Sequence, residues 1–107
     1  MISLEFGLNE NVIKQICSVF ESFPEIKKVI IYGSRAVGNF KDGSDIDLTL
    51  IGDNIEFEIL TKLLNELDDL LLPYQFDVSV FKNLDNQNLI SHIKKHGKIF
   101  FDITQIK

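Results

Sequence analysis

Two aspartates stand where their carboxylates can act together. Asp45 and Asp47 lie two residues apart in a run, Asp-Ile-Asp-Leu-Thr-Leu-Ile, that alternates polar and apolar residues as a half-buried strand does. Side chains two apart on a strand point the same way, so the carboxylates share one face, and Ile46 and Leu48 face the core. Like charges this close repel each other, and a divalent cation that prefers oxygen ligands, Mg²⁺ or Mn²⁺, relieves the repulsion.

A third aspartate, Asp77, lies between apolar residues in a second alternating run over residues 75–81. If this strand lies beside the strand of Asp45 and Asp47, all three carboxylates form one acidic cluster. Such a cluster can hold two metal ions about 4 Å apart, as in enzymes of in-line phosphoryl or nucleotidyl transfer. The competing interpretation is structural, because an alternating strand can have a solvated face and an edge strand often carries a charge.

A Gly-Ser pair follows the apolar, β-branched run 27–32 directly. Gly33 lets the backbone approach a ligand closely, and Ser34 can cap a short helix whose first N–H groups bind an anion. Arg35 and Lys41 are near in sequence and can neutralise a polyphosphate. The alternative is an ordinary strand-to-helix turn. The pair belongs to neither a P-loop nor a dinucleotide-binding fingerprint.

The elements that position these groups follow from the hydrophobic pattern. Helices are predicted over 9–22 (with Asn9 as N-cap), 56–71 and 86–96, strands over 27–32, 45–51 and 75–81, and a loop that can open with a short helix over 33–44. The apolar stripe of helix 56–71 includes Phe57 and Leu71. Strand 45–51, helix 56–71 and strand 75–81 form a βαβ unit with parallel strands. The fold class is therefore α/β (α+β), a small sheet flanked by helices.

Length and composition set limits on function. The chain has 107 residues, enough for one domain, and a net charge of −5, which disfavours general nucleic-acid binding. Its single cysteine, Cys17, excludes an intrachain disulfide and is expected to be a small buried apolar group. No apolar run approaches the roughly 20 residues of a membrane span, and no signal peptide is recognised. We therefore expect a cytoplasmic protein.

The order of these motifs is more specific than any one of them. Gly33-Ser34, a gap of ten residues, Asp45-x-Asp47 and then Asp77 resemble the motifs of the DNA polymerase β-type nucleotidyltransferase superfamily, above all its minimal nucleotidyltransferase (MNT) branch. The resemblance is strong over about residues 26–81. It implies the nucleotidyltransferase fold, with a small mixed sheet, in a single domain over residues 1–107.

The resemblance also implies roles for these residues. Gly33 and Ser34 would hold the β- and γ-phosphates of a nucleotide, and Asp45 and Asp47 would bind two Mg²⁺ ions. Asp77 would complete the site of the metal that activates the attacking hydroxyl. That hydroxyl would attack the α-phosphate of an NTP, with AMP transferred from ATP as the expected case and pyrophosphate released.

Further nucleotide contacts are expected from Arg35, Lys41 and Ser44. One departure from the branch stands in the same loop: Val37 occupies a position where its members commonly have a second arginine. Compared with the branch, a phosphate or acceptor contact would be missing there, which bears on substrate affinity. All three carboxylates are present, so the pattern predicts an active enzyme.

The family likeness implies a partner as well. MNT proteins often act as antitoxins beside a HEPN-domain toxin, in characterised cases by transferring AMP to a tyrosine of the toxin. Two alternatives stay open: a non-catalytic module that neutralises its partner by contact, and transfer to RNA or to a small molecule such as an aminoglycoside. Phe100, Phe101 and Ile103 belong to an apolar tail that is either a final strand packed in the core or a contact surface.

Two histidines, His92 and His96, stand four residues apart in the last predicted helix. This spacing can bind a transition metal, but no third ligand is evident. A solvated helix face shared with Lys94 and Lys95 is the expected arrangement.

Overall fold

A four-stranded mixed sheet organises the chain, of which the computed structural model describes residues 4–105. Its strands, in the spatial order β5-β4-β3-β6, are β3 (Ile26–Tyr32), β4 (Ile46–Gly52), β5 (Phe76–Val80) and β6 (Lys98–Asp102). β3 runs antiparallel to β4 and β6, whereas β4 and β5 are parallel. The parallel βαβ unit is thus confirmed, and the apolar tail provides an edge strand.

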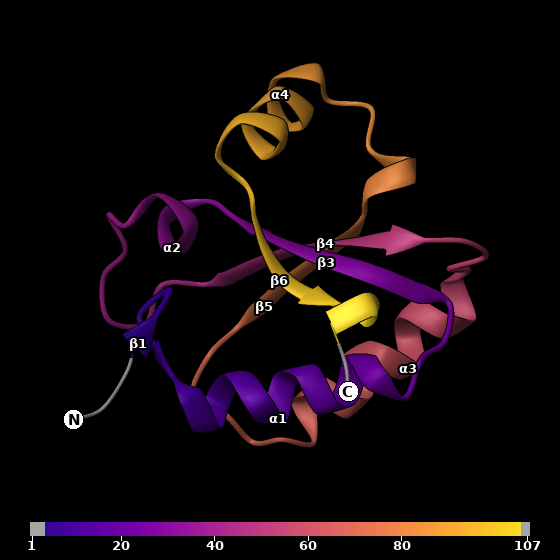
Figure 1. Ribbon diagram of the computed structural model, residues 1–107, viewed down its shortest axis with the longest axis horizontal. Helices are drawn as coiled ribbons and strands as arrows, with labels where there is room; N and C mark the ends of the chain where they lie inside the picture. The colour runs from indigo at the N-terminus through magenta and orange to yellow at the C-terminus, as the bar shows by residue number, and fades with distance from the viewer. Residues whose placement is uncertain (1–3, 106–107) are drawn as a thin grey trace.

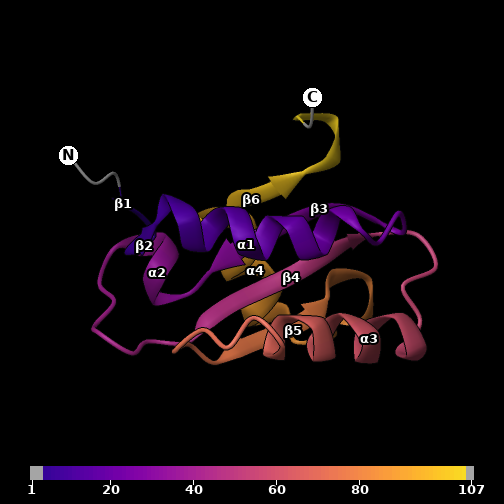
Figure 2. The same ribbon diagram turned by 90° about the horizontal axis from the view of Figure 1, so that it is seen from below.

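Helices cover both faces of this sheet (Figure 1). α1 (Glu10–Glu21) and α3 (Phe57–Asp68) lie side by side on one face, as the view from below also shows (Figure 2). α4 (Gln87–His96) crosses the other face, and the short α2 (Ser34–Val37) follows β3. No helix within residues 4–105 is long and apolar enough to cross a membrane.

The main core lies between the sheet and the pair α1 and α3. Alternate residues of β4 face it, and Ile46, Leu48 and Leu50 are all completely buried. The residues that meet them from the helices and from the other strands are Ile16, Phe20, Val29, Ile31, Leu63 and Leu67. Phe100 and Phe101 belong to the same core, which decides between the two interpretations of the tail. Because this face of β4 is apolar throughout, the intervening residues, Asp47 among them, face the side of α4.

Side-chain capping explains where α1 begins but not where α2 begins. The N–H of Val12 donates to Asn9 Oδ1 at 2.9 Å, which confirms Asn9 as the N-cap of α1. The expectation that Ser34 caps α2 is wrong. Gly33 occupies the N-cap position and Ser34 is the first helical residue, without a side-chain cap.

The prediction for α3 needs correction at both ends. The helix ends at Asp68, and Leu71, with φ of 55°, adopts the left-handed conformation and is 89% exposed. Phe57 is the first residue of the helix and is 80% exposed. The buried stripe is therefore shorter than the sequence pattern indicated. A two-stranded hairpin of β1 (Leu4–Glu5) and β2 (Leu8–Asn9), absent from the sequence-based prediction, precedes α1.

Candidate active site

The sheet register brings two of the predicted carboxylates together. Asp47 is paired with Asp77 across the parallel β4–β5 ladder and with Tyr32 across the antiparallel β3–β4 ladder. Asp45 immediately precedes β4 and is exposed. Asp47 and Asp77 therefore converge where β4 and β5 begin, with Asp45 just before β4.

The electrostatics of Asp47 reflect this convergence. Its pKa is raised above the ordinary value, first by partial burial and then by the negative charges of Asp77 and Asp45. The charged form of Asp47 is thus disfavoured in the protein alone and would be favoured by a bound cation.

Gly33 joins the Gly-Ser turn to this acidic cluster. Its φ of 75° and ψ of −156° fall in a region that is essentially restricted to glycine. A Cβ atom at this position would overlap the carboxylate oxygen Oδ2 of Asp47. The turn and the carboxylates, separate motifs in the sequence, therefore form one site.

Arg35, an expected nucleotide contact, is buried in the protein. Its side chain is 3% exposed, and Nε and Nη2 donate to the carbonyl oxygen of Ser44 at 3.1 and 3.0 Å. Nη1 donates to the carbonyl oxygen of Phe6 at 2.9 Å. The guanidinium also lies 5.3 Å from the ring centre of Phe40 and 5.1 Å from that of Tyr74. Three of its five N–H donors are thus used by the protein itself, and Arg35 holds the loop together.

Lys41 and Ser44 close the loop between α2 and β4. The N–H of Lys41 donates to Ser44 Oγ at 2.8 Å, and the N–H of Ser44 donates to the carbonyl of Lys41 at 3.0 Å. The hydroxyl of Ser44 is thus engaged in a turn, whereas the exposed side chain of Lys41 can reach a ligand from solvent.

His92 joins the site from the far end of the chain. The N–H of Gly33 donates to His92 Nε2 at 3.2 Å, and the imidazole meets the ring of Tyr32 edge-on, with the ring centres 6.3 Å apart. The expectation of a solvated face is wrong for His92, which is half-buried, and fits His96, which is exposed. The only sequence signal was the histidine pair itself, because the approach depends on how α4 crosses the sheet.

A row of hydroxyl side chains continues the site along the sheet. Tyr32 is buried, and burial, followed by the charges of Asp77 and Asp47, raises the pKa of its phenol. Farther along, Ser79 Oγ donates to Oγ1 of the fully buried Thr49 at 2.9 Å. Sequence reasoning missed these three residues, because each is an ordinary strand residue until the strands are placed in register.

The donor set fits a hard divalent cation. Within residues 4–105, no group of three or more His, Cys, Asp and Glu side chains already has the arrangement of a metal site. The two ion pairs of the same residues use Glu10 and Asp102, so Asp45, Asp47 and Asp77 have no cationic side chain as a partner. Converging, uncompensated carboxylates, one of them with a raised pKa, supply the oxygen ligands that Mg²⁺ prefers.

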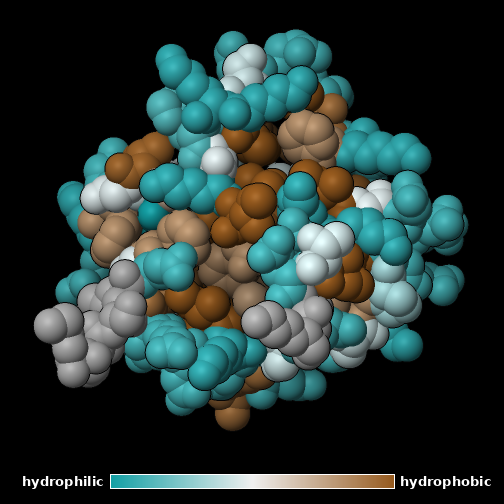
Figure 3. Space-filling view, viewed as in Figure 1, coloured by the Kyte–Doolittle hydropathy of each residue, from teal (hydrophilic) through white to brown (hydrophobic). Residues whose placement is uncertain are grey.

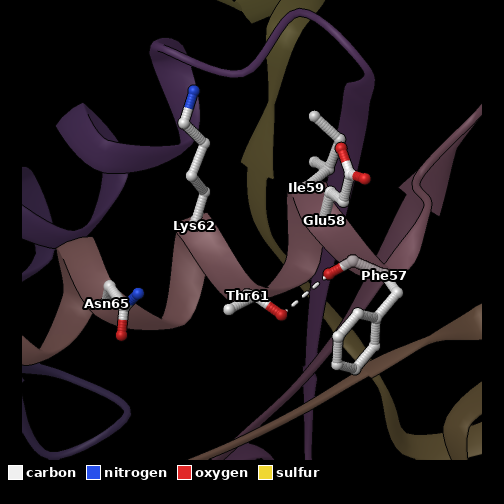
Figure 4. Close-up of a pocket in the computed structure, with 6 residues that line it drawn as sticks. All are labelled: Phe57, Glu58, Ile59, Thr61, Lys62 and Asn65. Atoms are coloured by element: carbon white, nitrogen blue, oxygen red, sulfur yellow. Dashed lines mark hydrogen bonds between the residues drawn. The ribbon is translucent and has the colours of Figure 1, made fainter.

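A separate hollow of about 400 Å³ lies along α3 (Figure 4). Its lining comes from that one helix: Phe57, Glu58, Ile59, Thr61, Lys62 and Asn65. The hydrogen bond drawn there joins Thr61 Oγ1 to the carbonyl of Phe57 at 2.9 Å, which is a contact within the helix. No reactive groups from different elements converge there, and α3 covers the face of the sheet opposite to α4, so this hollow is not part of the site.

Comparisons with known proteins identify the family of this chain. The family model described as "Polymerase beta, Nucleotidyltransferase" matches residues 14–106, which include the Gly-Ser turn and all three aspartates. The chain is 26% identical over 98 residues to the "Putative protein adenylyltransferase" of Methanocaldococcus jannaschii, covering 86% of this chain and 97% of the relative.

Solved structures share the fold. A toxin–antitoxin crystal structure with AMP-PNP aligns with a TM-score of 0.68 at 21% identity, over 89% of this chain and 74% of that one. The structure of a tri-AMPylated Shewanella oneidensis HEPN toxin in complex with MNT antitoxin aligns with a TM-score of 0.65 at 15% identity, over 90% of this chain and 74% of that one. Because the family model matches most of its length, the chain belongs to the polymerase beta nucleotidyltransferase family.

Proposed function

We propose that this nucleotidyltransferase is Mg²⁺-dependent and transfers AMP from ATP to a hydroxyl group of a partner protein. The observation that carries the proposal is the pairing of Asp47 with Asp77 beside Gly33. This arrangement places carboxylates that can bind metal ions next to a turn whose backbone, free of a side chain at Gly33, can approach a phosphate closely. Transfer from a nucleoside triphosphate requires both features. The domain would occupy residues 1–107.

Each residue has a defined task in this proposal. Asp45, Asp47 and Asp77 would hold two Mg²⁺ ions, which supply charge neutralisation for the phosphates and lower the pKa of the attacking hydroxyl. The Gly33–Ser34 turn would orient the β- and γ-phosphates. The acceptor oxygen forms a bond to the α-phosphorus, the bond from that phosphorus to the bridging oxygen breaks, the hydroxyl proton leaves to solvent, and pyrophosphate departs.

The names of similar proteins support ATP and a protein acceptor. One relative is described as a protein adenylyltransferase, and one structural neighbour is an MNT antitoxin with an AMPylated HEPN toxin. We therefore propose a HEPN-domain protein as the partner and an antitoxin role for this chain. The net charge of −5 makes RNA a less suitable acceptor.

A contact-only antitoxin is the second candidate, because the chain has apolar surface available. Ile99 on β6 is 55% exposed, and Figure 3 shows apolar side chains gathered across the middle of the molecule between α4 and α1. Co-expression of the HEPN-domain protein with wild type or with Asp77→Ala separates the two. Transfer predicts that neutralisation of toxicity is lost in the variant, whereas contact alone predicts that it persists. Co-purification of the variant with its partner checks that binding is intact.

A further inference from the structure

The hydrogen bond between Gly33 and His92 fixes the peptide that begins the Gly-Ser turn. The Gly33 N–H lies 3.2 Å from Nε2 of His92, in a part of the protein that is half-buried. Gly33 itself has φ of 75° and ψ of −156°, a conformation that persists only where surrounding contacts hold it. His92 provides one such contact, and it comes from an element 59 residues away in sequence.

α4 holds His92 firmly over the end of β3. Asn86 caps the start of the helix by accepting from the N–H of Leu89 at 3.1 Å. Ile93, the residue after His92, is 4% exposed and anchors the helix to the sheet. At the other end, Gly97 lies so close to Ile30 of β3 that a Cβ atom at residue 97 would overlap its side chain. The backbone of His92 is therefore held in a fixed position relative to the turn.

The direction of this hydrogen bond defines the state of the imidazole. Since Nε2 accepts, the neutral ring carries its hydrogen on Nδ1. We infer that His92 is a positioning residue: its Nε2 accepts the Gly33 N–H and so sets the orientation of the Gly33–Ser34 turn that receives the triphosphate. The choice of a triphosphate as the ligand of this turn rests on the proposed function. The residue does not contact the reacting atoms and acts through Gly33.

A positioning role predicts a selective kinetic effect. In His92→Leu, the Gly33 N–H loses its acceptor, and we expect KM and Kd for Mg-ATP to rise about tenfold, while kcat changes less than about threefold. His92→Gln, whose amide oxygen can accept the same N–H, should recover most of the affinity. His96→Leu is the matched control: its ring centre lies 5.2 Å from that of His92, but it is exposed and makes no bond to the turn, so the variant should behave as wild type.

Nuclear magnetic resonance tests the same bond without relying on activity. In wild type we expect the ¹⁵N shifts of the His92 ring to report the Nδ1–H tautomer, and the Gly33 amide to be protected from exchange. The protection should be lost in His92→Leu, return in His92→Gln and stay in His96→Leu. If wild type transfers no nucleotide, the proposed function fails, and Kd for a non-hydrolysable ATP analogue together with these spectra still decides the inference.

Three results would overturn it. The first is an Nε2–H tautomer of His92 in wild type. The second is a Gly33 amide that is unchanged in His92→Leu. The third is a fall in kcat and melting temperature with KM and Kd for the nucleotide unchanged, because that is the effect of lost stability alone.

Discussion

Gly33 lies directly against the carboxylate of Asp47, with no room for a Cβ atom between its backbone and Oδ2. The contact arises because β3 ends where β4 begins: Tyr32, the last residue of β3, is paired with Asp47. The antiparallel ladder thus brings the Gly-Ser turn to the acidic cluster although the two motifs are separated by a loop. This relationship makes a glycine necessary at residue 33 for two independent reasons, backbone conformation and space.

A comparison of two glycines with positive φ tests the requirement for glycine at residue 33. Gly33 and Gly43 both have positive φ, 75° and 83°, but a Cβ atom at residue 43 would have no neighbour within 4 Å. Gly43→Ala should therefore cost about 1 kcal/mol of unfolding free energy, and Gly33→Ala roughly 3 kcal/mol or more. Chemical denaturation measures both values. Equal losses would argue against the close approach of residue 33 to Asp47.

Asp47→Asn should stabilise the protein in the absence of divalent cations while removing its activity. The folded-state pKa of Asp47 is raised, so the folded state binds the proton more tightly than the unfolded state, and this contribution to stability is lost as the pH rises through the folded pKa. At pH 7 the carboxylate is thus unfavourable, and the asparagine variant should be more stable by up to about 1 kcal/mol, since Asp47 is only partly buried.

Thermal melting at several pH values checks this prediction. The difference in melting temperature between Asp47→Asn and wild type should shrink below the ordinary aspartate pKa of 3.8, because Asp47 is then neutral, like the asparagine that replaces it. Adding Mg²⁺ should raise the melting temperature of wild type and not that of the variant. A variant that is less stable than wild type at pH 7 without cations would contradict the account of the cluster.

Arg35→Lys should destabilise the fold. The guanidinium is buried, donates three hydrogen bonds to two carbonyl oxygens and lies against two rings, and an ammonium group cannot replace this planar set of donors. We expect a loss of about 2–3 kcal/mol in unfolding free energy by chemical denaturation. Weaker ATP binding at unchanged stability would instead indicate the phosphate contact that the sequence suggested.

Two substitutions in α3 test where its buried face lies. Leu63 is completely buried, and Leu63→Ala should cost about 2–5 kcal/mol. Phe57 is 80% exposed, and Phe57→Ser should change the unfolding free energy by less than about 0.5 kcal/mol. Urea titration of both variants gives the comparison. A large loss in Phe57→Ser would show that this ring is covered in solution.

The sequence predicted what local patterns determine. Alternation identified β4 and β5, their connection by one helix indicated parallel strands, and a parallel pair in register brings Asp47 opposite Asp77. The cap at Asn9 followed from residue type. Each of these features depends on neighbours in the sequence or on one general rule of topology.

What could not be predicted depends on contacts between distant segments. The β1–β2 hairpin turns at Phe6 and Gly7, both with positive φ, and phenylalanine is not a residue that signals such a turn. The role of Arg35 requires the loop to fold back onto its guanidinium. His92 reaches Gly33 only because α4 crosses the sheet at the end of β3.

The most direct test of the central claim is label transfer from ATP. Purified wild type and Asp77→Asn, matched for melting behaviour, are incubated with Mg²⁺ and a lysate of the source organism, with ATP labelled either at the α- or at the γ-phosphate. We expect a protein labelled from α-labelled ATP only, in the wild-type sample only. Label that persists in Asp77→Asn, label from the γ-phosphate, or no label in the wild-type sample would contradict AMP transfer from ATP by this site.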